Sequence, residues 1–314
     1  MLTAIPFVYH ASYSQLALPR THRFPTTKYQ LLYEYALEQQ LLHKSAQHIP
    51  APINIETLYT VHCPQYVDQF LNGLLEYKAQ RRIGFPWSDY LVTRTLHAVN
   101  GTVLCSQLAL EYGFAVHLTG GYHHAHHDFG SGFCVFNDLI IAAKLTIDSG
   151  KADKVLIFDC DVHQGDGTAT LAQRYPDIIS CSIHCAQNFP SRKQHSDHDI
   201  DLNKGCSDQE YLEHVQQILP YLIRLHQPDL IIYDAGVDIH QDDDLGYFNI
   251  SSQGILARDT QVISIAKSHN IPLAAVIGGG YSRNEAELTH RHSQLLVAAN
   301  ELWLSKSDSS TELV

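Results

Sequence analysis

The chain has 314 residues, of which 45% are apolar and 17% are charged, so it can bury a large hydrophobic core. Its net charge of −12 offers no basic surface for phosphates, and we expect no direct nucleic-acid partner. No run reaches the roughly 18 apolar residues of a membrane span, and the first ten residues lack a basic leader, so we expect a cytoplasmic protein without a membrane partner.

The first hundred residues give weak secondary-structure signals. We expect a helix around residues 29–46, between loop-like segments at residues 21–25 and 82–88. From about residue 110 onward, short apolar runs that end in polar or glycine-rich corners predict buried parallel strands. These runs cover residues 114–118, 155–158, 178–183, 230–233 and 273–277.

Helical patterns separate these predicted strands. Apolar spacings of three and four predict helices over residues 139–147, which Gly150 ends, and over residues 212–225, which Pro220 would kink. The alternation of strands and helices predicts a doubly wound α/β sheet, whose ligand sites lie beyond the carboxyl ends of the strands. We expect one domain over residues 1–304 and a disordered tail at residues 305–314.

Cysteine and histidine usage narrows the class of protein. The seven cysteines include no Cys-x-x-Cys pair, which predicts reduced thiols rather than disulfides or a zinc ribbon. The 21 histidines are unusual, because histidine is the commonest metal ligand and titrates near neutral pH. The positions where they cluster are therefore candidate sites.

The strongest candidate site follows the predicted strand at residues 155–158. Asp159, Asp161 and His163 alternate along an extended chain, so their side chains share one face. Such a group at a buried strand end is costly unless it is paired or coordinated. Asp238 follows another predicted strand, and Asp161, His163 and Asp238 together supply the three ligands of an open catalytic metal site.

Two further strand ends carry candidate catalytic groups. His123 and His124 follow a glycine pair and can serve as an electrostatic partner and a general base, with metal binding by this pair as the alternative. We expect His126 and His127 to be solvated. Tyr281 follows three glycines, and its phenol could stabilise an oxyanion.

Five motifs, in this order along the chain, resemble those of the histone deacetylase family. The ordered matches are Gly-Gly-Tyr-His-His (120–124), Ser-Gly-Phe-Cys (131–134), Asp-Cys-Asp-Val-His-Gln-Gly-Asp-Gly (159–167), Ala-Gly-Val-Asp (235–238) and Gly-Gly-Gly-Tyr (278–281). They run through nearly the whole chain. The His163-Gln164 pair and residues 233–246 are most similar to the class IV branch and its bacterial relatives.

The resemblance implies an arginase-like, three-layer α/β fold with a central, mostly parallel sheet. It also implies a zinc-dependent hydrolase that removes acetyl or longer acyl groups from lysine-like amines with metal-activated water. Asp161, His163 and Asp238 would hold one divalent ion per chain. Ferrous iron would accept the same one imidazole and two carboxylates.

The same resemblance implies roles for the other residues of the site. His124 would act as general base and acid beside His123, with Asp159 and Asp166 orienting the two rings, and Tyr281 would donate to the oxyanion. A tunnel for an acylated lysine side chain would be lined by Gly132, Phe133 and Phe189, and a structural potassium ion would contact Asp159 and Ser182.

Three other functions share the implied fold. An arginase-type ureohydrolase needs a second metal, but positions 165 and 236, where its extra carboxylates would fall, are both glycine. A non-catalytic acyl-lysine binder would be expected to lose Tyr281, His124 or a metal ligand, and all are present. Hydrolysis of acylated polyamines uses the same site, and the sequence leaves this alternative open.

Overall fold

A parallel β-sheet forms the centre of the computed structural model, which describes residues 4–19 and 21–304. Its eight strands follow the order β2-β1-β3-β8-β7-β4-β5-β6, and every neighbouring pair is parallel. The strands are β1 (Phe7–Val8), β2 (Gln47–His48), β3 (Phe114–His117), β4 (Val155–Asp159), β5 (Ile178–Cys185), β6 (His198–Leu202), β7 (Leu230–Asp234) and β8 (Leu273–Val276).

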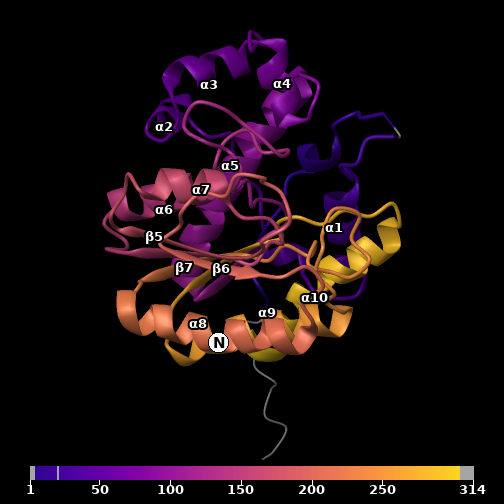
Figure 1. Cartoon of the computed structure of the whole chain (residues 1–314), viewed down its shortest axis with the longest axis vertical. Coiled ribbons are helices and arrows are strands. Elements are labelled where there is room, and N and C mark those ends of the chain that lie inside the picture. Colours follow the sequence, from indigo (N-terminus) through magenta and orange to yellow (C-terminus); the bar gives the residue numbers. More distant parts are fainter. Residues whose placement is uncertain (1–3, 20, 305–314) are drawn as a thin grey trace, which may run out of the picture.

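Helices cover both faces of this sheet, which gives the expected three layers (Figure 1). One face carries α8 (Asp208–His226), α9 (Ser252–Ser268) and α10 (Glu285–Trp303), and the other carries α5 (Asp89–Tyr112), α6 (Asp138–Asp148) and α7 (Asp166–Ala172). Helix α1 (Lys28–Glu38) packs against α10. Helices α2 (Ile55–Tyr59), α3 (Pro64–Leu71) and α4 (Tyr77–Ile83) lie beyond α5. No helix in the described ranges is long and apolar enough to cross a bilayer.

The five predicted strands are confirmed as β3, β4, β5, β7 and β8, each within two residues of its expected ends. The two predicted helices correspond to α6 and to α8, which continues through Pro220. The strands that the sequence did not reveal are β1 and β2, which are too short to show a period, and the edge strand β6, which carries polar residues on both faces. All seven cysteines are free thiols, as expected.

Two expectations for the first hundred residues are wrong. The helix expected over residues 29–46 ends at Glu38, because Gln40 turns the backbone into the left-handed region, with φ 58°. That turn returns buried Leu42 to the core, and glycine, its usual marker, is absent. The expected loop at residues 82–88 begins inside α4, which Gly84 ends with φ 92°. The tail at residues 305–314, expected to be disordered, lies outside the described residues.

Candidate active site

The carboxyl ends of β4 and β7, which are neighbours in the sheet, bring three candidate metal ligands together. Nδ1 of His163 lies 3.0 Å from Oδ1 of Asp161 and 3.1 Å from Oδ2 of Asp238, and all three side chains are buried. The other carboxylate oxygens accept backbone hydrogen bonds. Gly279 N–H donates to Asp161 and Val162 N–H donates to Asp238, both at 2.9 Å.

These three side chains fit one divalent cation. Burial opposes protonation of His163, but hydrogen bonds with Asp161 and Asp238 outweigh it and raise the pKa of His163 to about 10. The cluster therefore favours a positive charge between its donor atoms, and an imidazole with two carboxylates suits zinc or ferrous iron. Gly279 closes the cradle, since a Cβ at this position would overlap oxygens of both carboxylates.

Two histidine–aspartate pairs lie beside this cluster. Nδ1 of His123 is 2.7 Å from Oδ2 of Asp159, and Nδ1 of His124 is 2.7 Å from Oδ1 of Asp166. The Nε2 atoms of the two histidines lie 3.2 Å apart. The structure therefore brings the two predicted histidine–aspartate pairs together beside the three candidate metal ligands.

The two imidazoles have opposite proton affinities. Burial, together with the charge of His123, lowers the pKa of His124 to about 4. Burial also disfavours the charged form of His123, but the Asp159 and Asp161 carboxylates outweigh it and hold the pKa of His123 well above its usual range. These opposite shifts favour the neutral form of His124 and the charged form of His123 at pH 7, and such a difference lets a site separate base from acid.

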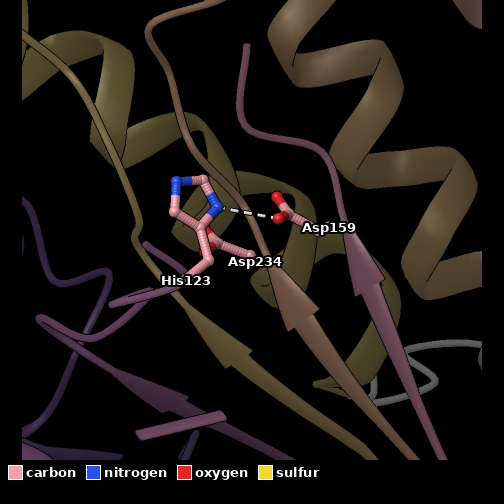
Figure 2. A group of neighbouring side chains, drawn as sticks. All are labelled: His123, Asp159 and Asp234. Carbon is pink, nitrogen blue, oxygen red and sulfur yellow. Dashed lines mark hydrogen bonds and ion pairs between the residues drawn. The ribbon is translucent and has the colours of Figure 1, made fainter. Parts of the chain in front are cut away.

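A second group with metal-ligand chemistry was not predicted from the sequence. His123, Asp159 and Asp234 lie together, and Figure 2 shows the His123 ring facing Asp159 with Asp234 beside it. Both Asp234 oxygens are buried without a hydrogen-bond partner within the described residues. Burial and the nearby Asp159 charge hold the pKa of Asp234 well above its usual range. Because His123 Nδ1 already faces Asp159, the group fits a hydrogen-bonded pair next to an uncharged carboxyl better than an ion.

Tyr281 reaches the site from the glycine turn after β8, and its ring centroid lies 6.4 Å from that of His163. Two residues that the sequence did not single out hold this turn. Lys28 Nζ donates to Gly278 O at 3.1 Å, and Tyr281 N–H donates to Oδ2 of Asp243 at 2.7 Å. Neither Lys28 nor Asp243 directly follows a strand, so strand-end reasoning could not find them.

A cavity of about 450 Å³ opens beside His124, His163 and Tyr281. Its wall includes Gly132, Phe133 and Phe189, the three residues expected to line an acyl tunnel. Phe133 has φ 67°, an unusual backbone conformation for a bulky residue. It is held there by its N–H, which donates to Ile83 O at the end of α4. Sequence periodicity gave no sign that α4 would form this wall.

The expected potassium ligands are neighbours across the sheet. Asp159 on β4 pairs with Ser182 on β5. However, Ser182 Oγ lies 3.0 Å from Nδ1 of His184, and the Asp159 oxygens contact His123 and the Asp161 N–H. A potassium site here stays a prediction.

The expectation that His126 and His127 are solvated is wrong. Both are only partly exposed. His126 Nε2 lies 3.1 Å from Oδ2 of Asp166, and His127 Nδ1 lies 2.7 Å from Val61 O. The segment folds back on itself because His126 N–H donates to Phe129 O, a contact that sequence spacing does not reveal.

The glycines that argued against a two-metal ureohydrolase are close-packed. A Cβ at Gly165 would lie 2.6 Å from Oδ2 of Asp159, and one at Gly236 would lie 2.6 Å from Oδ2 of Asp161. A carboxylate side chain has no room at either position. The second metal of that class therefore lacks its bridging ligands here.

Comparison with known proteins identifies what the chain resembles. The model of the histone deacetylase domain matches residues 22–296. An uncharacterised protein of Picosynechococcus is 45% identical over 95% of this chain and 99% of its own length, and histone deacetylase 2 of Arabidopsis thaliana is 29% identical over 91% and 77%. The crystal structure of the HDA15 HD domain, at 16% identity, superposes with a TM-score of 0.78 over 97% of this chain and 90% of its own, a likeness of fold.

Substitutions can distinguish the two candidate ligand groups. We expect Asp238→Ala to lose the bound divalent ion, because it removes one of three charged or imidazole ligands. Asp234→Asn should keep the ion, since Asp234 belongs to the other group. Elemental analysis of the purified variants gives the ion content per chain. If Asp234→Asn lost the ion and Asp238→Ala kept it, the ion would belong to the group of His123, Asp159 and Asp234 instead.

Proposed function

The chain belongs to the histone deacetylase family and is a hydrolase of the deacetylase type, and we propose that it hydrolyses the acyl amide of acylated lysine side chains. One observation carries this proposal. A candidate ion site, the His124 and His123 imidazoles with opposite proton affinities, and the Tyr281 phenol meet at two cavities that share His124 and Tyr281. Amide hydrolysis needs an activated water, carbonyl polarisation and a proton for the departing amine.

We propose zinc as the ion, held by Asp161, His163 and Asp238, with ferrous iron as an alternative that the same ligands accept. When bound, it would supply Lewis acidity that polarises the substrate carbonyl and favours ionisation of a water. The hydrogen bonds from Gly279 and Val162 fix the carboxylates in place, which pre-organises the donors.

The chain's own residues perform the proton transfers. Neutral His124 accepts a proton at Nε2 from the attacking water, because Asp166 holds its Nδ1, and later returns the proton to the leaving amine. Cationic His123 lies beside it and stabilises negative charge on the substrate. The phenol of Tyr281 donates to the carbonyl oxygen as the tetrahedral intermediate forms.

The cavity wall favours binding of an acylated lysine side chain over a free one. Phe133 and Phe189 line it and present aromatic faces to a methylene stem. A free ammonium would have to be desolvated there, and the wall has no Asp or Glu in the described part of the chain to compensate. Acylation removes that charge and with it the cost.

Cavity size supports acetyl as the acyl group. A second cavity shares His124, Gly132, Phe133 and Tyr281 with the first and extends to Lys28, but its volume is only about 20 Å³. That is space for roughly one water, so the second cavity adds little room for an acyl group longer than acetyl. Acceptance of longer acyl chains, expected from the class IV likeness, stays a prediction.

The charge at the cavity wall also favours lysine over polyamine substrates. Arg82 is the one Lys, Arg, Asp or Glu among the residues that line it, and it is exposed. An acetylpolyamine keeps at least one ammonium, which Arg82 would repel, whereas an acetyl-lysine side chain is neutral. We therefore favour acyl-lysine and treat acetylpolyamine as the alternative.

We extend the proposal to organisation and location. Residues 1–304 would form one catalytic domain, since a single sheet supplies every strand end of the site. The seven free thiols support a reducing, cytoplasmic compartment.

Tyr281→Phe tests the catalytic assignment. We expect kcat on an acetyl-lysine peptide to fall by about 100- to 1,000-fold, the range seen when one oxyanion donor is lost. Metal content should not change, because Tyr281 is outside the ligand group. A variant with full metal content and near wild-type kcat would show that the phenol is not the oxyanion donor.

Arg82→Glu tests the substrate assignment. Reversing this charge should raise the kcat/KM ratio of acetylspermidine to a neutral acetyl-lysine peptide by about three- to tenfold, a modest effect because the side chain is exposed. Arg81→Glu is the matched control, since Arg81 lies on the same helix but does not line the cavity. A wild-type enzyme that prefers acetylspermidine would instead support the polyamine alternative.

A further inference from the structure

His126 makes three side-chain contacts. Nε2 lies 3.1 Å from Oδ2 of Asp166, Nδ1 lies 3.0 Å from Oγ1 of Thr170, and the ring stacks on Phe129 with centroids 4.3 Å apart. Its side chain is only 12% exposed. The His126 ring is therefore held at both nitrogens and on one face.

Asp166 is shared between two imidazoles. Oδ1 lies 2.7 Å from Nδ1 of His124, and Oδ2 lies 3.1 Å from Nε2 of His126. A carboxylate held through one oxygen can still rotate about its terminal bond. When both oxygens are held, its plane is fixed, and the direction of the hydrogen bond to His124 is fixed with it.

We propose that His126 is a positioning residue of the active site, which clamps Asp166 so that the carboxylate keeps His124 in the orientation and tautomer of a general base. The proposal rests on the function proposed above, in which His124 is that base. Within the described residues, His126 lines neither cavity and makes no hydrogen bond to Asp161, His163 or Asp238; it acts through Asp166.

Thr170 lies at the other nitrogen of the His126 ring, where its hydroxyl can favour the tautomer that this role needs. A neutral imidazole can donate to Asp166 from Nε2 only if Nδ1 is unprotonated and accepts a hydrogen bond. The Thr170 hydroxyl lies 3.0 Å from that nitrogen and also 3.0 Å from Gly167 O, and it supplies this hydrogen bond when its one hydrogen points to His126 rather than to Gly167 O. Thr170 is in α7, the helix that begins at Asp166, so one element supplies both partners of the ring.

His127 provides a matched comparison. It is the next residue along the same segment and is also partly buried, but its Nδ1 lies 2.7 Å from Val61 O and 2.7 Å from Nη1 of Arg174. No contact joins His127 to Asp166 in the described structure. Removing its nitrogens therefore perturbs the segment without touching the clamp.

Three variants separate positioning from packing. His126→Phe keeps a ring against Phe129 but removes the donor, and we expect kcat to fall by about 10- to 100-fold with KM and metal content unchanged. His126→Gln supplies an amide donor and should restore most of kcat. His127→Phe should keep the wild-type kcat. Wild-type kcat in His126→Phe, or equal loss in His126→Phe and His126→Gln, would overturn the proposal.

Proton NMR of the imidazoles reads the same arrangement without turnover. We expect a protected Nδ1–H signal of His124 in the wild type and in His126→Gln, and its broadening by exchange in His126→Phe. If the wild type releases no acyl group from any acyl-lysine peptide, the proposed function fails, but this signal still decides the positioning role. An unchanged His124 signal in His126→Phe would overturn that role.

Discussion

The structure depends on a buried cluster of two carboxylates around one imidazole. Burying Asp161 and Asp238 is costly unless each oxygen has a partner. One oxygen of each accepts a backbone N–H, and the other faces Nδ1 of His163. A positive charge at its centre would balance the cluster, and glycine is needed at position 279 because a Cβ there would overlap oxygens of both carboxylates. The two carboxylates that could hold an ion therefore also determine which residue fits at position 279 of the neighbouring turn.

The cost of burying charge also explains why the pKa values of His123 and His124 shift in opposite directions. Their Nε2 atoms are 3.2 Å apart, so two cations side by side would repel strongly. The Asp159 and Asp161 charges raise the pKa of His123, whereas the pKa of His124 is lowered. Burial, with the charge of His123 as the second cause, therefore favours the neutral form of His124. The proposed preference for a neutral, acylated amine follows from the cavity wall, which includes aromatic rings and Arg82 but no Asp or Glu among the described residues.

Much of this arrangement could be predicted because it lies at strand ends. The spacing of Asp159, Asp161 and His163 predicted that they lie together, although β4 ends at Asp159 and residues 161–163 form a bend, and the parallel sheet brings Asp238 beside them. What the sequence could not show depends on long-range contacts. Lys28 and Asp243 reach the Tyr281 turn from segments far away in the chain, and Asp234 lies just beyond the apolar run at residues 230–233. The early end of α1 lacked a glycine marker, and the role of His126 depends on a carboxylate forty residues later.

The most direct test of the account is the metal dependence of turnover. The purified chain, stripped of metal by a chelator, would be titrated with Zn²⁺ while release of acetate from an acetyl-lysine peptide is measured. The account predicts no turnover in the metal-free protein and a rate that rises with added Zn²⁺ to a plateau at one ion per chain. A plateau reached only at two ions, or acetate release that is independent of metal, would contradict the single-ion deacetylase site.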